Sequence, residues 1–333
     1  MGARLRTNYL GAVDLTEFGV AWPTERRAGG LGATPAHQPV QLWWRVENPA
    51  FGGRPRIGWR FRSALLDGVA KTDVGYRRER TTGAQSLSVA ATLTYANVID
   101  TSFIDALWSN RRSVDLDLHI RSDRAFANGD RWLDEARFVF GYDTTGYAKA
   151  EVAVGGTHPV SDRTQLAARV FAGIEYDAPW QRALYLSAAD PLATFENHWW
   201  RPAGALLKRP GVHWLPLGGP ALRGYQWDVA SKFAIATNLE ASRLVAESST
   251  ASHALALRLV AFADVGTLET FFENVFADAG VGANVRGRIF DRDVVVRLDA
   301  PFYVSQPSFG IDRARRSGQP FAARWVVTFN DIW

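Results

Sequence analysis

Apolar and polar residues alternate along several long stretches of the chain. In QSLSVAATLTY (85–95), every second residue is apolar or aromatic, and the positions between them are mostly serine and threonine. The same period of two runs through RSVDLDLHIR (112–121), HALALRLVAFADVG (253–266) and DVVVRLDAPFY (293–303). Successive side chains of a β-strand point to opposite faces, so these stretches are predicted to be strands with one apolar and one polar face.

Strand patterns recur from one end of the chain to the other. No stretch longer than about ten residues has a convincing helical period of 3.6. We therefore expect an all-β protein of about 12 to 16 antiparallel strands, with 14 to 16 favoured. Residues 1–333 are expected to form a single domain whose segment 1–39 is a poorly patterned strand region. The further strand candidates are 5–22, 40–46, 56–62, 72–78, 134–142, 147–155, 165–176, 228–241, 278–287 and 321–333.

The length and charge of these strands favour a transmembrane β-barrel over a soluble sandwich. A tilted strand crosses a membrane in about 9–11 residues, whereas sandwich strands average about 5–6. Many of the predicted strands reach ten residues, and their polar faces carry successive charged side chains. Short connections such as 143–146 and 287–292 alternate with the long segments 96–111, 177–226 and 304–320. Because lipid satisfies no open strand edge, a sheet in a membrane is expected to close.

The bulk composition excludes several functional classes. The net charge is +4, but the basic residues are scattered rather than clustered, so no nucleic-acid partner is expected. Cysteine is absent, and the six histidines show no metal-ligand spacing. No nucleophile elbow is present. We therefore expect no enzyme, no cofactor and no metal site. The opening segment MGARLRTNYLGAVDL has no apolar secretory region, and the sequence is interpreted as the barrel piece of a longer protein.

Two short motifs connect the loop 177–226 with a strand. The loop ends in LRGY (222–225), and FADVG (262–266) follows about forty residues later. The pair resembles the motifs of the BamA/TamA/FhaC-type barrels, the bacterial surface antigen family. This resemblance implies that a long extracellular loop folds back into the barrel lumen and that an arginine at its tip meets a carboxylate on the wall. The residues implied are Arg223, Gly224 and Tyr225 in the loop and Phe262, Asp264 and Gly266 on the strand.

The alternation pattern, taken independently, places Asp264 on the polar face of its strand. The segment NLEASR (238–243) resembles the strand after the loop and offers Glu240 as a possible second acceptor. An arginine in a confined lumen loses its hydration, which is costly unless a carboxylate meets it. Guanidinium and carboxylate groups can then bond bidentately. We therefore expect an ion pair between Arg223 and Asp264 to hold the loop inside the lumen.

The end of the chain carries a second resemblance. In FAARWVVTFNDIW (321–333), Trp325, Phe329 and Trp333 share one face, with Asp331 as an interruption. This arrangement resembles the C-terminal recognition signal of bacterial outer-membrane proteins.

The resemblance covers residues 165–333 well and implies a location in the outer membrane of a Gram-negative bacterium. Members of the family insert or secrete proteins without ATP. The partners implied are outer-membrane lipid and lipopolysaccharide, unfolded outer-membrane or secreted proteins, and periplasmic domains upstream of this chain. Two alternatives stay open at this point: a C-terminal anchor barrel of a larger envelope protein such as a peptidase, and a plugged pore.

Overall fold

The computed structural model describes residues 2–9, 14–21, 41–48, 57–66, 68–99, 109, 112–187, 192, 218–226, 229–249, 253–269, 275–289, 292–311 and 318–328. Its regular elements are strands and two short 3₁₀ turns, η3 (Trp180–Arg182) and η5 (Pro307–Phe309). No helix in the described part of the chain is long and apolar enough to cross a membrane. The strands are β1 Gly2–Tyr9, β2 Asp14–Ala21, β3 Gln41–Asn48, β4 Ile57–Leu66, β5 Val69–Thr82, β6 Gln85–Val98, β7 Arg112–Ala125, β8 Arg131–Tyr142, β9 Gly146–Pro159, β10 Thr164–Tyr176, β11 Leu184–Tyr185, β12 Ala230–Ser231, β13 Phe233–Ser249, β14 His253–Leu268, β15 Val275–Ile289, β16 Arg292–Val304 and β17 Val326–Thr328.

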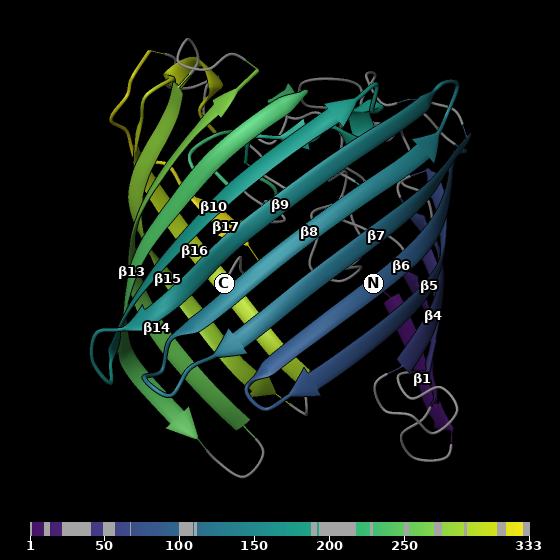
Figure 1. Ribbon diagram of the computed structural model, residues 1–333, viewed down its shortest axis with the longest axis horizontal. Coiled ribbons are helices and arrows are strands. Elements are labelled where there is room, and N and C mark those ends of the chain that lie inside the picture. Colours follow the sequence, from purple (N-terminus) through teal and green to yellow (C-terminus); the bar gives the residue numbers. More distant parts are fainter. Residues whose placement is uncertain are drawn as a thin grey trace.

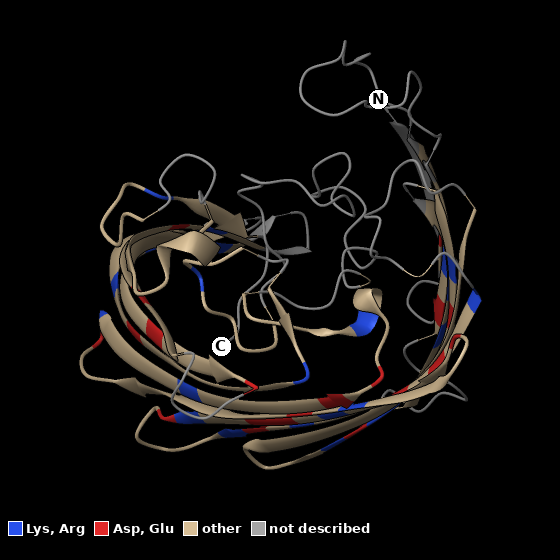
Figure 2. Cartoon of the chain, turned by 90° about the horizontal axis from the view of Figure 1, so that it is seen from above, with Lys and Arg blue, Asp and Glu red and all other residues tan. Residues whose placement is uncertain are grey.

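One large sheet contains nearly all of these strands. Along the described residues it has fifteen strands in the order β1 to β10 followed by β13 to β17, and each strand pairs antiparallel with the next. The small ladder β11–β12 lies apart from it. Seen from above, the sheet curls around an interior, as the wall of a barrel does (Figure 2). The prediction of an all-β antiparallel barrel is confirmed, and no pairing joins β1 to β17 along the described residues.

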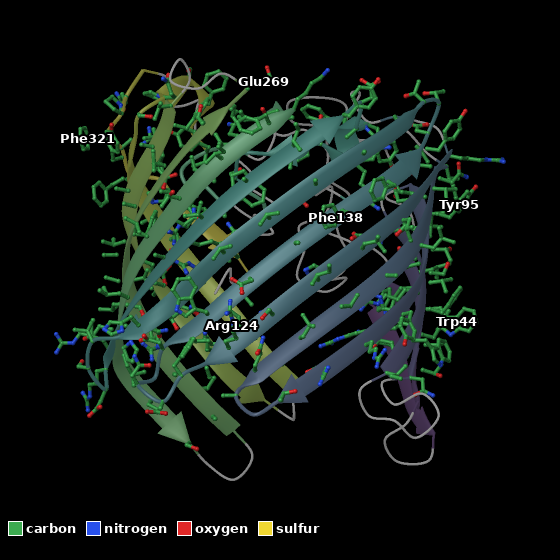
Figure 3. All side chains as sticks on the ribbon, in the orientation of Figure 1. Trp44, Tyr95, Arg124, Phe138, Glu269 and Phe321 are labelled. Atoms are coloured by element: carbon green, nitrogen blue, oxygen red, sulfur yellow. The ribbon has the colours of Figure 1, made fainter. Side chains whose placement is uncertain are left out.

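The two faces of the curved sheet differ in chemistry. Alternate residues of β10, such as Val170 and Ile174, are exposed on the outer face, whereas Arg169 and Phe171 are buried on the inner face. The same alternation runs along β9, β13 and β14. Trp44, Tyr95 and Phe321 project from the outer side of the sheet (Figure 3). A soluble protein covers apolar strand faces, whereas a membrane protein presents them to lipid and keeps charged residues inside.

The two ends of the sheet carry different connections. At one end, which we call the turn end, the connections 83–84, 126–130, 160–163 and 290–291 are short. At the opposite end, the loop end, the segments 22–40, 99–111, 177–229 and 305–325 are long, whereas the connections 67–68 and 143–145 at the same end are short. The longer strands run strongly tilted between the two ends (Figure 1). Strands β4 to β10 and β13 to β16 contain between 10 and 17 residues, which suffices to cross a membrane.

The apolar core lies inside the curved sheet near the loop end. There, Phe171 of β10 and Phe276 of β15 pack with Leu184, Leu222 and Tyr225 of the segment between β10 and β13. The wall therefore buries its interior apolar residues against its own loop.

The last strand is shorter than the sequence pattern predicts. Residues 321–333 were expected to form one strand, but the described ladder covers only Val326–Thr328, with an isolated bridge at Phe321. Arg324 is buried, and it donates hydrogen bonds to the carbonyl oxygens of Gln319 and Pro320 at 2.6 and 3.2 Å. Such side-chain bonds to local backbone compete with ladder pairing. Trp325 is exposed, and Phe329 and Trp333 lie outside the described residues.

Candidate functional site

Residues 218–226, which we call the loop tip, lie against the inner face of β13, β14 and β15. The backbone at Gly219 and Ala221 has positive φ angles of 56° and 55°. For alanine this left-handed conformation costs about 1–2 kcal/mol, so surrounding contacts must hold it in place. Residues 220–226 are all buried. The loop tip is thus a folded, enclosed segment of the interior.

The guanidinium group of Arg223 is the centre of these contacts, and its side chain is 0% exposed. Its Nε and Nη2 atoms donate to the two carboxyl oxygens of Asp264 on β14, at 2.8 and 2.7 Å. Its Nη1 donates to Glu240 on β13 at 3.0 Å. Bidentate bonds of this kind are among the stronger hydrogen bonds in proteins, because both partners are charged and their geometries match.

The other two residues of the F-x-D-x-G motif also contact the loop tip. The guanidinium of Arg223 lies over the ring of Phe262, with Cζ 3.8 Å from the ring centre. A desolvated cation over an aromatic face is stabilised by about 2 kcal/mol. At position 266, an added Cβ would lie 3.1 Å from a methyl group of Leu222 and 2.9 Å from the carbonyl oxygen of Ile235. Gly266 therefore leaves the space that Leu222 occupies.

Glu240 connects Arg223 to a second buried cation, Arg297 of β16. The Nη2 of Arg297 donates to the same Glu240 oxygen at 2.8 Å, and its Nε donates to Asp299 at 2.6 Å. Arg297 reaches Glu240 across two intervening strands. This crossing passes Gly280 and Gly282 of β15, where a Cβ would lie 2.4 Å from Ala300 O and Asp299 Oδ1, respectively. The inward glycines thus make room for the ion-pair network.

Two wall residues bind the backbone of the loop tip. The Nδ2 of Asn238 on β13 donates to the carbonyl oxygens of Pro220 and Ala221 at 3.1 and 3.3 Å, and to Asp264 at 3.1 Å. The Nη1 of Arg169 on β10 donates to the carbonyl oxygen of Gly219 at 2.8 Å. These bonds satisfy carbonyl groups that would otherwise be buried without a donor.

Tyr225 extends the contact to the opposite side of the tip. Its hydroxyl donates to the carbonyl oxygen of Ala277 at 2.8 Å, and its ring packs edge-on against Phe276. The backbone of Gly224 accepts a bond from Ile311 at 3.0 Å. The loop between β16 and β17 therefore covers the loop tip.

The interior around the tip carries more carboxylates than guanidinium groups. Asp278 faces Asp264 across the β14–β15 pair and is 2% exposed. Its carboxyl group interacts with the backbone of Gly224 and with the carboxyl group of Asp264. Carboxylates buried side by side are costly, so the positive charge of Arg223 stabilises more than the two carboxylates that it contacts directly. The carboxylates of this cluster are Glu240, Asp264, Asp278 and Asp299.

We expect Gly224→Ala to displace the loop tip. A Cβ at this position would lie 2.6 Å from a methyl group of Val304 and 2.8 Å from Cβ of Asp278. Overpacking of this kind costs about 1–3 kcal/mol. Limited proteolysis of the loop should become faster in this variant. Gly146→Ala is the matched control, because nothing lies within 4 Å of its added Cβ. Equal cleavage rates in the two variants would contradict the expected role of Gly224.

A second ion pair attaches the beginning of the loop to the wall. The Nε and Nη2 of Arg182 in η3 donate to Asp115 of β7 at 3.1 and 2.6 Å, and both side chains are buried. The backbone N–H of Leu184 donates to Glu175 at 3.1 Å. The loop is thus bonded to the inner face at both of its described ends.

The structure brings together all six residues of the two motifs and also Glu240. Sequence reasoning did not assign the contacts of Asn238, Arg169, Arg182 and Asp115 to the loop. The inward positions of Asn238, Arg169 and Asp115 follow from the alternation, but the path of the loop, which carries Arg182, does not. Among the described residues, no group of three or more His, Cys, Asp and Glu side chains is arranged to hold a metal ion.

Fold and site together define a large antiparallel barrel wall that holds its own loop in the interior. No family model matches the sequence, and no curated protein matches it. Among solved structures, CdiB from Escherichia coli is similar in fold, with 12% identity and a TM-score of 0.47 over 98% of this chain and 51% of that chain. The chain therefore spans about half the length of that CdiB chain.

Two further solved structures are similar in fold. BamA from Haemophilus ducreyi lacking POTRA domains 1–3 has 12% identity and a TM-score of 0.45 over 98% of this chain and 69% of that one. A bacterial polysaccharide outer membrane secretin has 10% identity and a TM-score of 0.36 over 88% of this chain and 93% of that one.

Proposed function

We propose that this protein is an integral β-barrel of the bacterial outer membrane that inserts or translocates other proteins. The observation that supports the proposal is the buried contact of Arg223 in the loop tip with Asp264 and Glu240 of the wall. We further propose that this contact acts as a clamp that keeps the loop within the lumen. No catalytic chemistry is assigned to the site, because its charged groups are engaged with one another.

The membrane location is supported by the outer face. Large apolar side chains are exposed there on strand after strand, including Leu93, Phe140, Leu239 and Leu259. In water, a contiguous exposed apolar surface of this extent leads to association, whereas in lipid it is stabilising.

We propose that a substrate polypeptide contacts the chain at the edge strands of the sheet, β1 and β17, and not through the lumen. The loop tip occupies part of the interior, so the lumen is not an open channel for a passenger chain at that level. Pairing between β16 and β17 covers only three positions in the described residues, and β1 has no partner on its second side there. Free strand edges are templates for pairing with another chain. An unfolded outer-membrane or secreted protein is therefore proposed as the substrate.

The other partners follow from the two ends of the barrel. Membrane barrels have short turns on the periplasmic side and long loops on the outside. We therefore propose that the loop end faces lipopolysaccharide. Gly2 of β1 pairs with Ala21 at the loop end, so periplasmic domains upstream of this chain would join it through one further strand that crosses to the turn end, where they would receive substrate.

An insertion assay tests the proposal. Because the sequence contains no cysteine, one cysteine in β1 and one in β17 can be bridged by a bifunctional crosslinker without side reactions. In liposomes, the chain should accelerate folding of an unfolded outer-membrane barrel severalfold, and bridging should abolish the acceleration. The same two-cysteine variant without crosslinker is the control.

Two results would overturn this function. If the substrate barrel folds equally fast with and without the chain, the chain does not insert proteins and the anchor-barrel alternative is favoured. A large steady conductance of the intact chain in planar bilayers would instead indicate a passive pore.

A further inference from the structure

The outer face carries a groove near the turn end, across β9, β10, β13 and β14. Its volume is about 800 Å³, which is within the usual range for a small-molecule site. Most of its lining is apolar, and the lining combines neighbouring outward positions of these strands with inward positions between them. The outward residues along its floor and walls are Trp132, Val154, Gly156, Leu166, Ala168, Val170, Leu239, Ala241, Ala261 and Ala263.

The groove is produced by a cluster of small outward residues between large ones. Strand pairing places Gly156 beside Ala168, and Ala241 beside Ala261. Elsewhere on the outer face, many outward positions carry leucine, valine or aromatic side chains, such as Leu93, Leu116 and Phe140. The edge of the groove is formed by Trp132 and Leu239, which are 45% and 50% exposed. An elongated apolar molecule therefore finds walls on two sides instead of a flat surface.

Two arginines lie where the groove meets the turn end. Arg243 follows Ala241 at the next outward position of β13, and it pairs with Thr164 at the start of β10. Arg163 stands in the turn just before Thr164, and both arginines are exposed. Neither guanidinium has a hydrogen bond or an ion pair within the described part of the chain. Each is therefore available to an anionic ligand.

The nearest acidic side chain at the groove is already engaged. His158 Nδ1 lies 2.6 Å from Asp130 Oδ1, and bonds from His158 and Asn128 lower the pKa of the Asp130 carboxyl. On the other side, Asp162 precedes Arg163 in the turn. Two arginines against this one remaining carboxylate leave a net positive charge at the rim.

We propose that this groove binds one anionic glycerophospholipid, with an acyl chain over the small residues and the phosphate at Arg163 and Arg243. The inference rests on the proposed membrane location. The order of chemistry along the groove, apolar and then cationic toward the turn end, matches the order along a phospholipid. Arginine is well suited to phosphate because its planar fork bonds two oxygens at once.

The position of the groove near the turn end also indicates which of the two outer-membrane lipids it would bind. Short turns face the periplasm, and that leaflet contains phospholipid, whereas lipopolysaccharide is on the loop side. The groove opens toward the turn end through Arg163 and Arg243. The proposal therefore commits to a phospholipid of the periplasmic leaflet.

The test uses the full chain folded into vesicles of phosphatidylethanolamine and phosphatidylglycerol, then extracted into mild detergent. Native mass spectrometry counts the phospholipids that stay bound. We expect one phosphatidylglycerol to be retained preferentially. Arg163→Ala combined with Arg243→Ala should lower its occupancy about tenfold or more, because charge-assisted bonds to phosphate are lost. Ala168→Phe, which fills the groove, should do the same.

Matched controls separate this site from the general lipid shell. Arg78 occupies an outward, exposed position on β5, and Ala172 lies on the same face of β10 as Ala168 but outside the groove. Arg78→Ala and Ala172→Phe should retain the lipid at the level of the original chain. Equal losses in the controls and the groove variants, or no preferential retention at all, would overturn the proposed site.

The same preparation separates failure of the site from failure of the proposed location. Folding into vesicles is read from protection of the strands against protease. A chain that folds into vesicles but retains no specific lipid overturns the groove alone. A chain that does not enter vesicles overturns the membrane location and the groove together.

Discussion

Replacing Arg223 with alanine is expected to release the loop tip and to lower the free energy of unfolding by about 3–5 kcal/mol. The variant leaves Asp264 buried without its cation and Glu240 with Arg297 alone, next to the buried carboxyl group of Asp278. The removal of one partner from a buried ion pair costs this much because the remaining charge is neither hydrated nor neutralised. Denaturant unfolding in vesicles measures the stability, and limited proteolysis of residues 218–226 measures release of the tip.

The control for this experiment is Arg77→Ala. Arg77 forms an ion pair with Glu79 at 2.8 Å, but its side chain is 62% exposed. Exposed pairs contribute at most about 1 kcal/mol, so this variant should unfold almost as the original chain does. A further change of Asp264 to alanine in the Arg223→Ala background should restore part of the lost stability. An Arg223→Glu variant with an intact, protected loop would contradict the clamp.

Replacing Arg297 with methionine is expected to cost a similar amount, about 3–5 kcal/mol, but to leave the loop in place. Arg297 bonds Glu240 and Asp299, which belong to the wall and not to the loop tip. Glu240 keeps its bond from Arg223 in this variant, and Asp264 keeps both of its own. We therefore expect Arg297→Met to lower the free energy of unfolding without making proteolysis of the loop tip faster.

The measurements are the same two as for Arg223, so the variants form a direct comparison. Arg297→Lys should recover only part of the loss, because a single ammonium group cannot reproduce the fork that bonds two carboxylates. Faster cleavage of residues 218–226 in Arg297→Met would show that the clamp depends on the whole network. An unchanged unfolding midpoint of Arg297→Met would show that the ion pairs of Arg297 with Glu240 and Asp299 are hydrated.

The alternation of the sequence was sufficient to predict which residues of each strand face inward. It placed Asp264 on the inner face, because side-chain direction in a strand follows from position alone, whereas Glu240 was offered through the resemblance of residues 238–243. It did not predict that Asn238 and Arg169 bind the loop carbonyls. Those contacts depend on the path of a loop without any period, and on left-handed backbone at Ala221 that no local pattern indicates.

Residues 321–333 show a second limit of prediction from the sequence pattern. The pattern of 321–333 is that of a strand, yet the ladder in the described residues is confined to Val326–Thr328. The bonds of the buried Arg324 to the nearby carbonyl groups of Gln319 and Pro320 compete with ladder pairing, and the alternation of the sequence does not indicate them. Predictions for Phe329 and Trp333, which lie outside the described residues, and for a single domain over 1–333 stay predictions.

The count of strands has a consequence for how the sheet edges can meet. Neighbours in an antiparallel sheet alternate in direction, and the sheet in the described residues has fifteen strands, an odd number. Its first and last strands, β1 and β17, therefore run the same way. Direct contact between them would be a parallel ladder, whose slanted bonds are slightly weaker. One additional strand of opposite direction would pair antiparallel with both edges at once, so parity alone makes this edge favour an inserted strand over closure.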